Sequence, residues 1–459
     1  MKSLQEDCNF EIKATTDQIN SLAQSIASVT KQINTIENNG GRANDLRDAR
    51  NLMIDELSEL ANITVDERVL GASEVGTTQF LVRLDGKILV DTYEYNTIEC
   101  VPKESGVSQN DADGLYDLRW SNGQSFSTRS TTLGGKLQAL LEVRDGNNQE
   151  NLSGNAAGSR GDTEVVLTGT NCNDINRLNI PASDGIIMVG SNRYEYSSFK
   201  VDIDADGNYT YTFQLKEPLK KDADGLNGHV GESIDYKGIP YYMAKLNEFV
   251  RTFASSFNEL HKQGRDLHGD EGLDFFNGKQ ATTGLNYSFS ENPTSFNSLP
   301  VDEHGNIIMD GELVAGNYYY MTAANFCVSD TIMDDPDTIA AAKMPADASV
   351  STGIENSDIL DQLVALKSDK GMFKQGTPSA FLRTLTAEIG VNGHKATTFA
   401  KSQSNILKAI DIQRMSVSGV DKDEEGVDLV RFKQAYDLSA KFIQTMNEIY
   451  DKLINYMGV

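Results

Sequence analysis

The chain closes with the stretch VRFKQAYDLSAKFIQTMNEIYDKLINYM, residues 430–457, in which apolar residues recur on a fixed grid. Steps of three and four residues alternate along Phe432, Ala435, Ser439, Phe442, Met446, Ile449, Leu453 and Tyr456. Only Ser439 on this grid is polar. The alternation is typical of a helix that packs against another helix along a heptad seam. Because such a helix holds its shape in water only when the seam is buried, the rest of the chain should indicate its partner.

A second heptad grid lies near the start of the sequence. Its members are Ile12, Ile19, Leu22, Ile26, Val29, Ile33 and Ile36. They predict a coiled-coil-like helix over residues 10–37, which ends before Gly40 and Gly41. Apolar spacing predicts another helix over residues 44–61, so the two should form an αα-hairpin. The buried face of that second helix is predicted to carry Leu46, Ala49, Met53, Leu57 and Leu60.

Strand-like patterns fill much of the middle of the chain. The pairs Asp85–Gly86 and Asn122–Gly123 are typical of two-residue hairpin turns. Residues 147–162 are polar, small and glycine-rich, and we interpret them as a linker. Helical spacing returns near residue 239, in a stripe of Met243, Leu246, Val250, Phe253, Phe257 and Leu260.

These patterns predict an α+β multidomain fold: a discontinuous helical bundle or coiled-coil domain with β-rich domains inserted into it. Helices are also predicted over residues 378–389 and 395–416. The predicted parts are, in order, a first helical part (1–65), a β-rich domain (66–132), a helical return (133–149), an inserted β domain (150–238), a continued helical domain (239–275), a second β-rich domain (276–350), a last helical part (351–417) and a C-terminal axial helix (418–459).

The charge balance and the cysteines narrow the class of protein. Lys and Arg number 41 against 67 Asp and Glu, a formal net charge of −26. Nucleic acid and anionic membrane surfaces are therefore poor partners, because they carry the same sign of charge. No run approaches the ~18 apolar residues of a membrane span, and the first residues carry no Sec signal. The four scattered cysteines predict buried thiols, and neither a zinc site nor a disulfide framework.

Four segments of the chain resemble flagellar axial proteins, and their order along the chain matches too. The segment nearest the C-terminus, residues 418–455, has the Ser-Gly-Val turn, Asp-Glu-Glu cap and Phe-x-x-Ala-Tyr core of rod, hook and hook-associated proteins. The others are NDLRDARNLMIDELSELANITV (44–65), LGGKLQALLEVRD (133–145) and FASSFNELHKQGRDLHGDEGLDFF (253–276). These three are similar to successive segments of the flagellar hook-associated protein 1 family. The resemblance covers the helical parts of the chain and none of the β-rich ones.

The resemblance implies a structural role without catalysis or a cofactor: an adaptor that joins the hook of the flagellum to its filament by helix–helix packing. It implies export by the flagellar type III route, without a Sec signal, to an extracellular position. The implied partners are the hook protein, hook-associated protein 3 and other axial subunits, further copies of the chain in a ring, and a flagellar export chaperone.

The resemblance also assigns a partner to the terminal helix. The implied assembly and chaperone interface consists of Leu429, Phe432, Ala435, Tyr436, Phe442, Met446, Ile449, Leu453 and Tyr456. In the family this helix pairs with an N-terminal helix, to which nothing before Cys8 corresponds. The chain is therefore expected to lack that N-terminal helical segment, and much of residues 420–459 is expected to be loosely ordered in isolation.

Three short motifs could indicate a ligand. Residues 202–208, DIDADGN, begin like a calcium loop, but Phe213 stands where such a loop needs a Glu, so a hairpin turn is predicted. Residues 266–274 place four carboxylates beside His268, and the family resemblance makes them a polar loop after a helix rather than a metal site. The tripeptide at residues 160–162, Arg-Gly-Asp, is interpreted as a chance occurrence of an adhesion motif.

No GxSxG, Walker, GxGxxG or HExxH pattern occurs, so no enzyme is predicted.

Two other functions remain open from the sequence. Another axial subunit, of the hook or the rod, is disfavoured by residues 44–65 and 249–276. A secreted adhesin or carbohydrate-binding protein would use the inserted β domain and its aromatic residues Tyr194, Tyr196, Phe199, Tyr209, Tyr211 and Phe213. Their alternation is explained as well by one buried face of a sheet.

Overall fold

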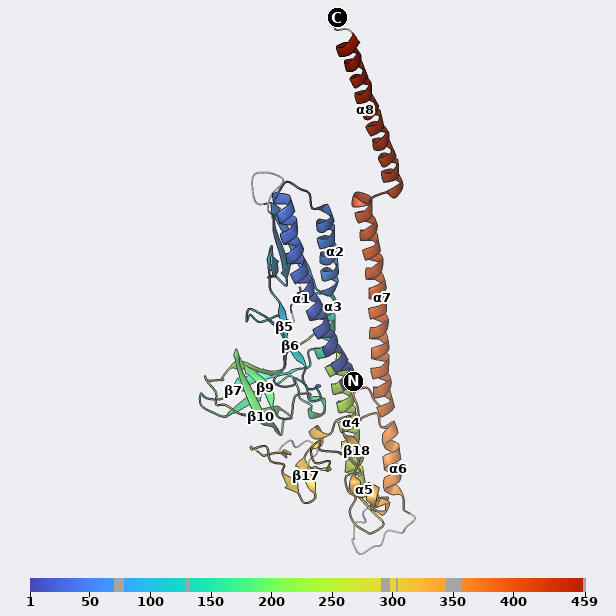
Figure 1. Cartoon of the computed structure of the whole chain (residues 1–459). Coiled ribbons are helices and arrows are strands. Elements are labelled where there is room, and N and C mark those ends of the chain that lie inside the picture. Colours follow the sequence, from blue (N-terminus) through green and yellow to red (C-terminus); the bar gives the residue numbers. More distant parts are fainter. Residues whose placement is uncertain are drawn as a thin grey trace. The chain divides into compact units, whose positions relative to one another are not determined.

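The computed structural model describes residues 1–69, 78–128, 130, 132–289, 298–302, 304–343 and 356–456 (Figure 1). The chain divides into two compact units, Met1–Phe381 and Leu382–Val459. Long helices and several separate sheets confirm the predicted α+β class. None of the described helices is long and apolar enough to cross a membrane.

The N-terminal helices of the first unit enclose one apolar core. Helix α1 (Lys2–Asn38) packs against α2 (Asn44–Leu60) and α3 (Gly135–Asp145), which lie beside it in Figure 1. The predicted heptad grid of α1 is confirmed in part: Ile12, Ile19, Ile26 and Ile33 are completely buried, Leu22 and Val29 are half-buried, and Ile36 is exposed. Their partners belong to the same chain, so this seam closes a domain core. In α2, Leu57 and Leu60 are buried, and the other predicted residues are half-buried.

The strands that complete this core form two antiparallel sheets. The four-stranded sheet has the order β1-β2-β3-β4, with bounds Ile63–Val69, Thr78–Leu84, Lys87–Asp91 and Glu94–Tyr95. The second sheet pairs β5 (Ile98–Pro102) with β6 (Tyr116–Trp120). The predicted turn at Asp85–Gly86 joins β2 to β3, and both of its residues have positive φ, as a type I′ turn requires.

The inserted domain is a closed barrel of six strands in the order β10-β11-β8-β7-β12-β9. Their bounds in chain order are β7 Leu152–Ala157, β8 Glu164–Thr168, β9 Gly185–Val189, β10 Asn192–Ile203, β11 Tyr209–Leu215 and β12 Leu226–Val230. Five of the six aromatic residues singled out in the sequence are buried in the barrel core, and Tyr209 is partly buried. They form the buried face of a sheet and offer no exposed platform to a sugar.

The predicted linker over residues 147–162 is wrong, because β7 is a barrel strand within it. The small residues of this stretch serve packing. A Cβ on Gly154 would lie 2.8 Å from the Thr170 side chain and 2.9 Å from the Thr168 carbonyl oxygen. A glycine that allows close approach of a neighbouring strand cannot be told, from the sequence alone, from a glycine in a flexible linker.

Helix α4 (Ile239–His261) leads from the barrel to a region of short strands. Those strands are β13 Gly264–Arg265, β14 Phe276–Gly278, β15 Tyr287–Phe289, β16 Met309–Asp310, β17 Leu313–Gly316, β18 Phe326–Val328 and β19 Ala342–Lys343. Among them lie the 3-10 turns η2 (Tyr318–Tyr320) and η3 (Pro336–Thr338) and the short helix α5 (Asp330–Asp334). Helix α6 (Asp358–Ala365) packs on α4 and β19.

The helix predicted from residue 239 is present, but its most buried face is not the predicted apolar stripe. Of that stripe only Met243 is buried, and the others are half-buried. The buried face carries Asn247, Arg251, Ala254, Asn258 and His261. These polar side chains bind the backbone of the short-strand region. Asn258, for example, donates to the Phe276 carbonyl (2.7 Å) and accepts from the Phe276 N–H (2.9 Å).

Candidate assembly surface

Helices α7 (Pro378–Ser418) and α8 (Lys422–Tyr456) form almost all of the described second unit. The predicted break between residues 389 and 395 is wrong, since α7 is continuous there. Gly390 and Gly393 lie in open space and lack positive φ, so they occupy the helix without ending it. A glycine inside a helix costs only about 1 kcal/mol relative to alanine, too little to end a long helix on its own.

Helix α8 begins with the acidic cap expected from the sequence. The Asp421 carboxylate accepts the N–H of Asp423 (2.9 Å), and the Asp421 carbonyl accepts the N–H of Glu425 (3.0 Å). Asp423, Glu424 and Glu425 fill the first turn. Their negative charge faces the positive end of the helix dipole, which stabilises the start of α8.

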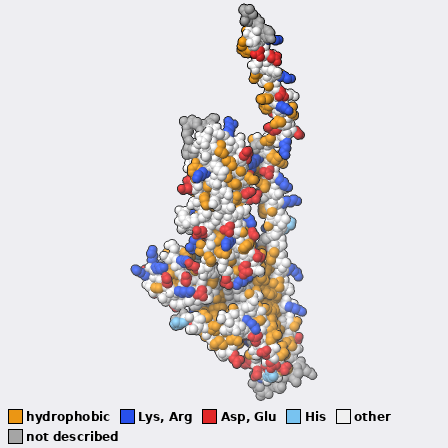
Figure 2. Space-filling view, viewed as in Figure 1, with side chains coloured by type: hydrophobic (Ala, Val, Ile, Leu, Met, Phe, Trp, Pro, Cys, Tyr) orange, Lys and Arg blue, Asp and Glu red, His pale blue; other side chains and the backbone are white. Residues whose placement is uncertain are grey.

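The apolar face of α8 is exposed to solvent over its described length. Leu429, Phe432, Tyr436, Phe442, Ile449 and Leu453 have exposed fractions between 49% and 75%. Ala435 is exposed, Met446 is half-buried, and the side chain of Tyr456 lies outside the described residues. Figure 2 shows hydrophobic side chains among charged ones along the segment that Figure 1 labels α8. An amphipathic helix with such a face is typical of a partner-binding element.

Helix α7 carries a second exposed seam, which the spacing of apolar residues alone does not predict. Its apolar members Ile389, Phe399, Ile406, Ile410 and Val417 have exposed fractions between 46% and 89%. Steps of three and four connect them through Asn392, Ala396, Gln403 and Gln413. The three polar members hide the pattern when only apolar residues are counted, yet single polar residues in a seam are a usual means of fixing its register.

The start of α7 is held in the first unit by aromatic packing. Phe381 is buried, with its ring centroid 4.7 Å from that of Phe373 and 5.6 Å from that of Phe249. Phe249 belongs to α4 and also stacks on Phe373 at 5.4 Å. Up to Phe381 the chain is therefore part of the first unit's core, and the exposed seams begin beyond it.

The stretch resembling a calcium loop is the turn between β10 and β11, as predicted. The Asp204 carboxylate accepts the backbone N–H groups of Asp206 (2.9 Å) and Asn208 (2.8 Å) and the Asn208 side-chain amide (2.8 Å). These hydrogen bonds, chiefly those from Asn208, hold the pKa of Asp204 below its usual value. The carboxylate that would bind an ion is thus committed to its own turn.

The Arg-Gly-Asp tripeptide and the cysteines carry no assigned role. The Arg160 N–H donates to Asp222, and the Asp162 carboxylate accepts the Ser159 N–H, so both residues belong to a hydrogen-bonded turn. All four cysteines are free thiols. Cys8 is buried, and the other three are partly buried, so the prediction of buried thiols is confirmed only for Cys8.

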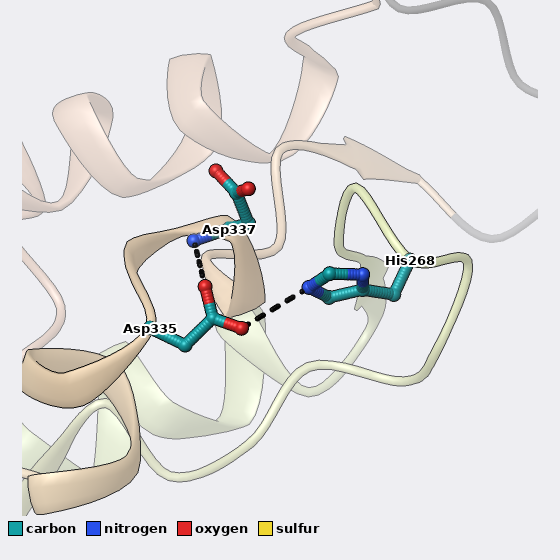
Figure 3. Close-up of side chains that lie close together, drawn as sticks. All are labelled: His268, Asp335 and Asp337. Carbon is teal, nitrogen blue, oxygen red and sulfur yellow. Dashed lines mark hydrogen bonds and ion pairs between the residues drawn. The ribbon is translucent and has the colours of Figure 1, made fainter.

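The carboxylates of the acidic loop at residues 266–274 do not converge on His268 in the structure. Asp274 pairs with Lys262 at 2.7 Å, while Asp266 accepts the N–H groups of His268 (2.9 Å) and Asp270 (2.8 Å). His268 instead faces Asp335 from another part of the chain, with Nε2 3.2 Å from Oδ2 (Figure 3). No local sequence pattern predicts this contact, because the two residues are 67 positions apart.

Two family models match the chain, and the first spans β strands as well as helices. The family model "Flagellar hook-associated protein FlgK helical domain" matches residues 1–157 and 164–276. The model "Flagellar basal body rod FlgEFG protein C-terminal" matches residues 413–456, which include the seam of α8.

Relatives named "Flagellar hook-associated protein 1" match as well. The protein of that name from Bacillus subtilis (strain 168) is 23% identical over 462 residues, which cover 100% of this chain and 68% of the relative. The one from Escherichia coli (strain K12) is 29% identical over 253 residues, covering 46% of this chain and 45% of the relative.

A solved structure of the flagellar hook junction protein FlgK from Burkholderia pseudomallei gives a TM-score of 0.43 at 15% identity. It covers 91% of this chain and 86% of that one. The first family model alone accounts for more than half of the chain. The chain therefore belongs to the family of FlgK-type flagellar hook-associated proteins.

Proposed function

We propose that this chain is a structural, non-catalytic subunit of the hook–filament junction, where it joins two lattices of the flagellum by helix–helix packing. The observation that carries the proposal is the exposed heptad seam of α8 in a chain of this family. An apolar stripe open to water is unfavourable, and each large side chain that it buries in a partner contributes about 1.5–3 kcal/mol before the cost of ordering.

The seams define the kind of partner that would fit. A heptad stripe packs best against another helix, because knobs on one helix enter holes on the other. The hook protein, hook-associated protein 3, other axial subunits and further copies of this chain in a ring are partners of that kind. The second family model supports this, since the α8 segment matches a module named for basal body rod FlgEFG proteins.

Before assembly the apolar seam of α8 would need a different binding partner to shield it from water. An export chaperone that binds an amphipathic helix in an apolar groove would be that partner and keep the subunit from self-association. This step fits export by the flagellar type III route and a final extracellular position. Leu429, Phe432, Ala435, Tyr436, Phe442, Met446, Ile449, Leu453 and Tyr456 remain the proposed interface.

The alternative functions have less support. The rod-type module does not distinguish a hook or rod subunit from a junction protein, but the FlgK-type match over residues 1–157 and 164–276 favours the junction. An adhesin would need the aromatic residues of the barrel at its surface, and five of those six are buried.

The test is electron microscopy of two strains: one that lacks the gene, and the same strain with the gene restored on a plasmid. Without the gene we expect hooks without filaments, and filament subunit lost to the medium; intact filaments would overturn the proposal. For the seam, Ile449→Asp is compared with Val430→Asp. Val430 is apolar and similarly exposed, at 53% against 49% for Ile449. It precedes Phe432 by two residues, which correspond to ~200° around a helix, so it lies off the seam. Only Ile449→Asp should abolish filaments.

A further inference from the structure

Three metal-ligating side chains from two separate segments converge on the surface of the first unit (Figure 3). His268 lies on the loop that follows β13, while Asp335 and Asp337 lie at the start of η3. One donor atom from each lies within 4.8 Å of the others, and all three residues are exposed.

The distance between two of the donors matches that between ligands of one ion. His268 Nε2 and Asp335 Oδ2 are 3.2 Å apart. Two donors that each lie about 2.1 Å from an ion are about 3.0–3.4 Å apart at octahedral or tetrahedral angles. Figure 3 shows the imidazole and the Asp335 carboxylate facing each other, with the Asp337 side chain on the adjoining turn. One carboxylate oxygen of Asp337 lies within 4.8 Å of both of these donors.

The backbone holds the two segments together at this point. The Leu267 N–H donates to the Asp337 carbonyl at 3.0 Å, directly beside the cluster. The Asp337 N–H donates to Asp335 Oδ1 at 3.1 Å, which orients that carboxylate and leaves Oδ2 toward the histidine. Donors that are already oriented need less ordering when an ion arrives, so binding loses less entropy.

The charges around the cluster favour a cation. Among the described residues, neither Asp335 nor Asp337 forms an ion pair with a Lys or Arg, although many other carboxylates of the chain do. The carboxylates of Asp335 and Asp337 carry like charges that repel one another, and a divalent cation between them relieves that repulsion.

We propose that His268, Asp335 and Asp337 form a surface site for a divalent transition-metal ion of the Zn²⁺ class, with water in the remaining positions. One imidazole nitrogen and two carboxylate oxygens suit Zn²⁺, Ni²⁺ or Co²⁺, whereas Ca²⁺ and Mg²⁺ prefer oxygen donors alone. The ion would tie the loop after α4 to η3. This site is independent of the proposed role in assembly.

The test is isothermal titration of the full chain, stripped with a chelator, with ZnCl₂. His268→Gln and Asp335→Asn should weaken Zn²⁺ binding by at least the ~10- to 100-fold typical of lost supporting groups. The matched controls are His304→Gln, which alters another exposed loop histidine, and Asp334→Asn, which removes a neighbouring carboxylate. Both controls should bind like the wild type, and CaCl₂ should give no comparable heat.

A second readout separates the site from the four thiols, which can also bind zinc. Co²⁺ is paramagnetic, so among the five histidines the His268 ring signals should broaden first in the NMR spectrum. The proposal fails if the wild type takes up no Zn²⁺, if His268→Gln binds as tightly as the wild type, or if other rings broaden before that of His268.

Discussion

Arg251 shows at the scale of one residue how the first unit is held together. Its guanidinium is completely buried and donates to the carbonyls of Met321 (3.0 Å), Leu178 (3.0 Å) and Tyr319 (2.9 Å). It also lies 4.3 Å from the centre of the Tyr319 ring. Burial lowers its pKa to about 10, so it stays charged at neutral pH. One side chain thereby joins α4, the barrel and η2.

Arg251→Met should therefore destabilise the protein by about 3–5 kcal/mol, because several buried carbonyls would lose their donor at once. Arg160→Met is the matched control, since Arg160 is exposed and should change stability by no more than about 0.5 kcal/mol. Urea unfolding followed by circular dichroism measures both. Equal midpoints for the two variants would show that Arg251 is not an anchor.

His261 makes the stability depend on pH. Its Nδ1 contacts the Leu273 carbonyl at 2.6 Å, and its Nε2 accepts the Ala340 N–H at 2.9 Å, so the ring is held neutral. Burial lowers the pKa of His261 below the usual 6.5. The unfolded chain thus binds a proton at a higher pH than the folded chain does. The stability from this residue is complete above pH ~6.5 and declines as the pH falls below it.

We expect the wild type to lose stability between pH 7.5 and pH 5.5, and His261→Gln to lose less over the same interval. The comparison concerns the slope with pH, so it remains valid although the variant is less stable at both values. Urea titrations at four pH values give the slopes. Parallel slopes would assign the pH dependence to other groups.

At the scale of elements, α1 binds strand edges through side-chain amides. Asn20 donates to the Ile98 carbonyl and accepts the Ile98 N–H, both at 2.8 Å. Asn34 does the same with Thr78, both at 2.9 Å. Asn9 bonds the Gly114 carbonyl (3.2 Å) and the Tyr116 N–H (2.9 Å). Each amide takes the place of a neighbouring strand, so the helix satisfies backbone groups at strand edges.

Asn20→Ala should cost about 2 kcal/mol, since it leaves the N–H and the carbonyl of Ile98 without these partners. Gln24→Ala removes an exposed amide from the same helix and should be nearly neutral. Trp120 pairs with Ile98 across β5 and β6 and is the only tryptophan, so its fluorescence reports on this contact directly. An unchanged midpoint for Asn20→Ala would contradict the proposed role of the amide.

Gly390 and Gly393 test whether α7 is one helix. Alanine fits at both positions, because nothing lies within 4 Å of the Cβ that it would add. The double variant should stabilise the helix by up to about 1 kcal/mol per site and raise the helical signal in circular dichroism. If the chain turned at these glycines with positive φ, alanine would instead reduce the signal, as the originally predicted break requires.

At the scale of the whole molecule, the two units differ in what covers their apolar residues. The first has several packed cores, whereas the described side chains of α8 are nearly all exposed. In proteins most of the stability of a helix comes from tertiary packing of its amphipathic face, which the described part of α8 largely lacks. The expectation that residues 420–459 are loosely ordered in isolation is thus compatible with a helical conformation and stays a prediction.

Hydrogen exchange monitored by mass spectrometry decides this point. Amides of α8 should exchange much faster than those of α1, whose apolar stripe is buried. Binding of a partner to the seam should slow the exchange of α8 and leave that of α1 unchanged. Equal protection of α1 and α8 in the isolated chain would show that α8 already has a partner there.

The features that depend on local periodicity could be predicted from the amino-acid sequence alone. Heptad spacing predicted α1 and α8, and apolar spacing predicted α2. Paired turn residues predicted the β2–β3 hairpin, and the alternating aromatic residues of the inserted domain fit one buried face. Four motifs in order also sufficed for the family. These signals lie within a few residues of one another, so no knowledge of distant contacts is needed to read them.

The features in which polar or small residues form the packing contacts became visible only in the folded chain. Gly154 lies in a barrel strand and not in a linker, the buried face of α4 is polar, and His268 meets Asp335 across 67 positions. An amide that binds a strand edge and an amide in water look the same in a sequence. The difference lies in which backbone groups the fold brings opposite them, and that is fixed by contacts between distant segments.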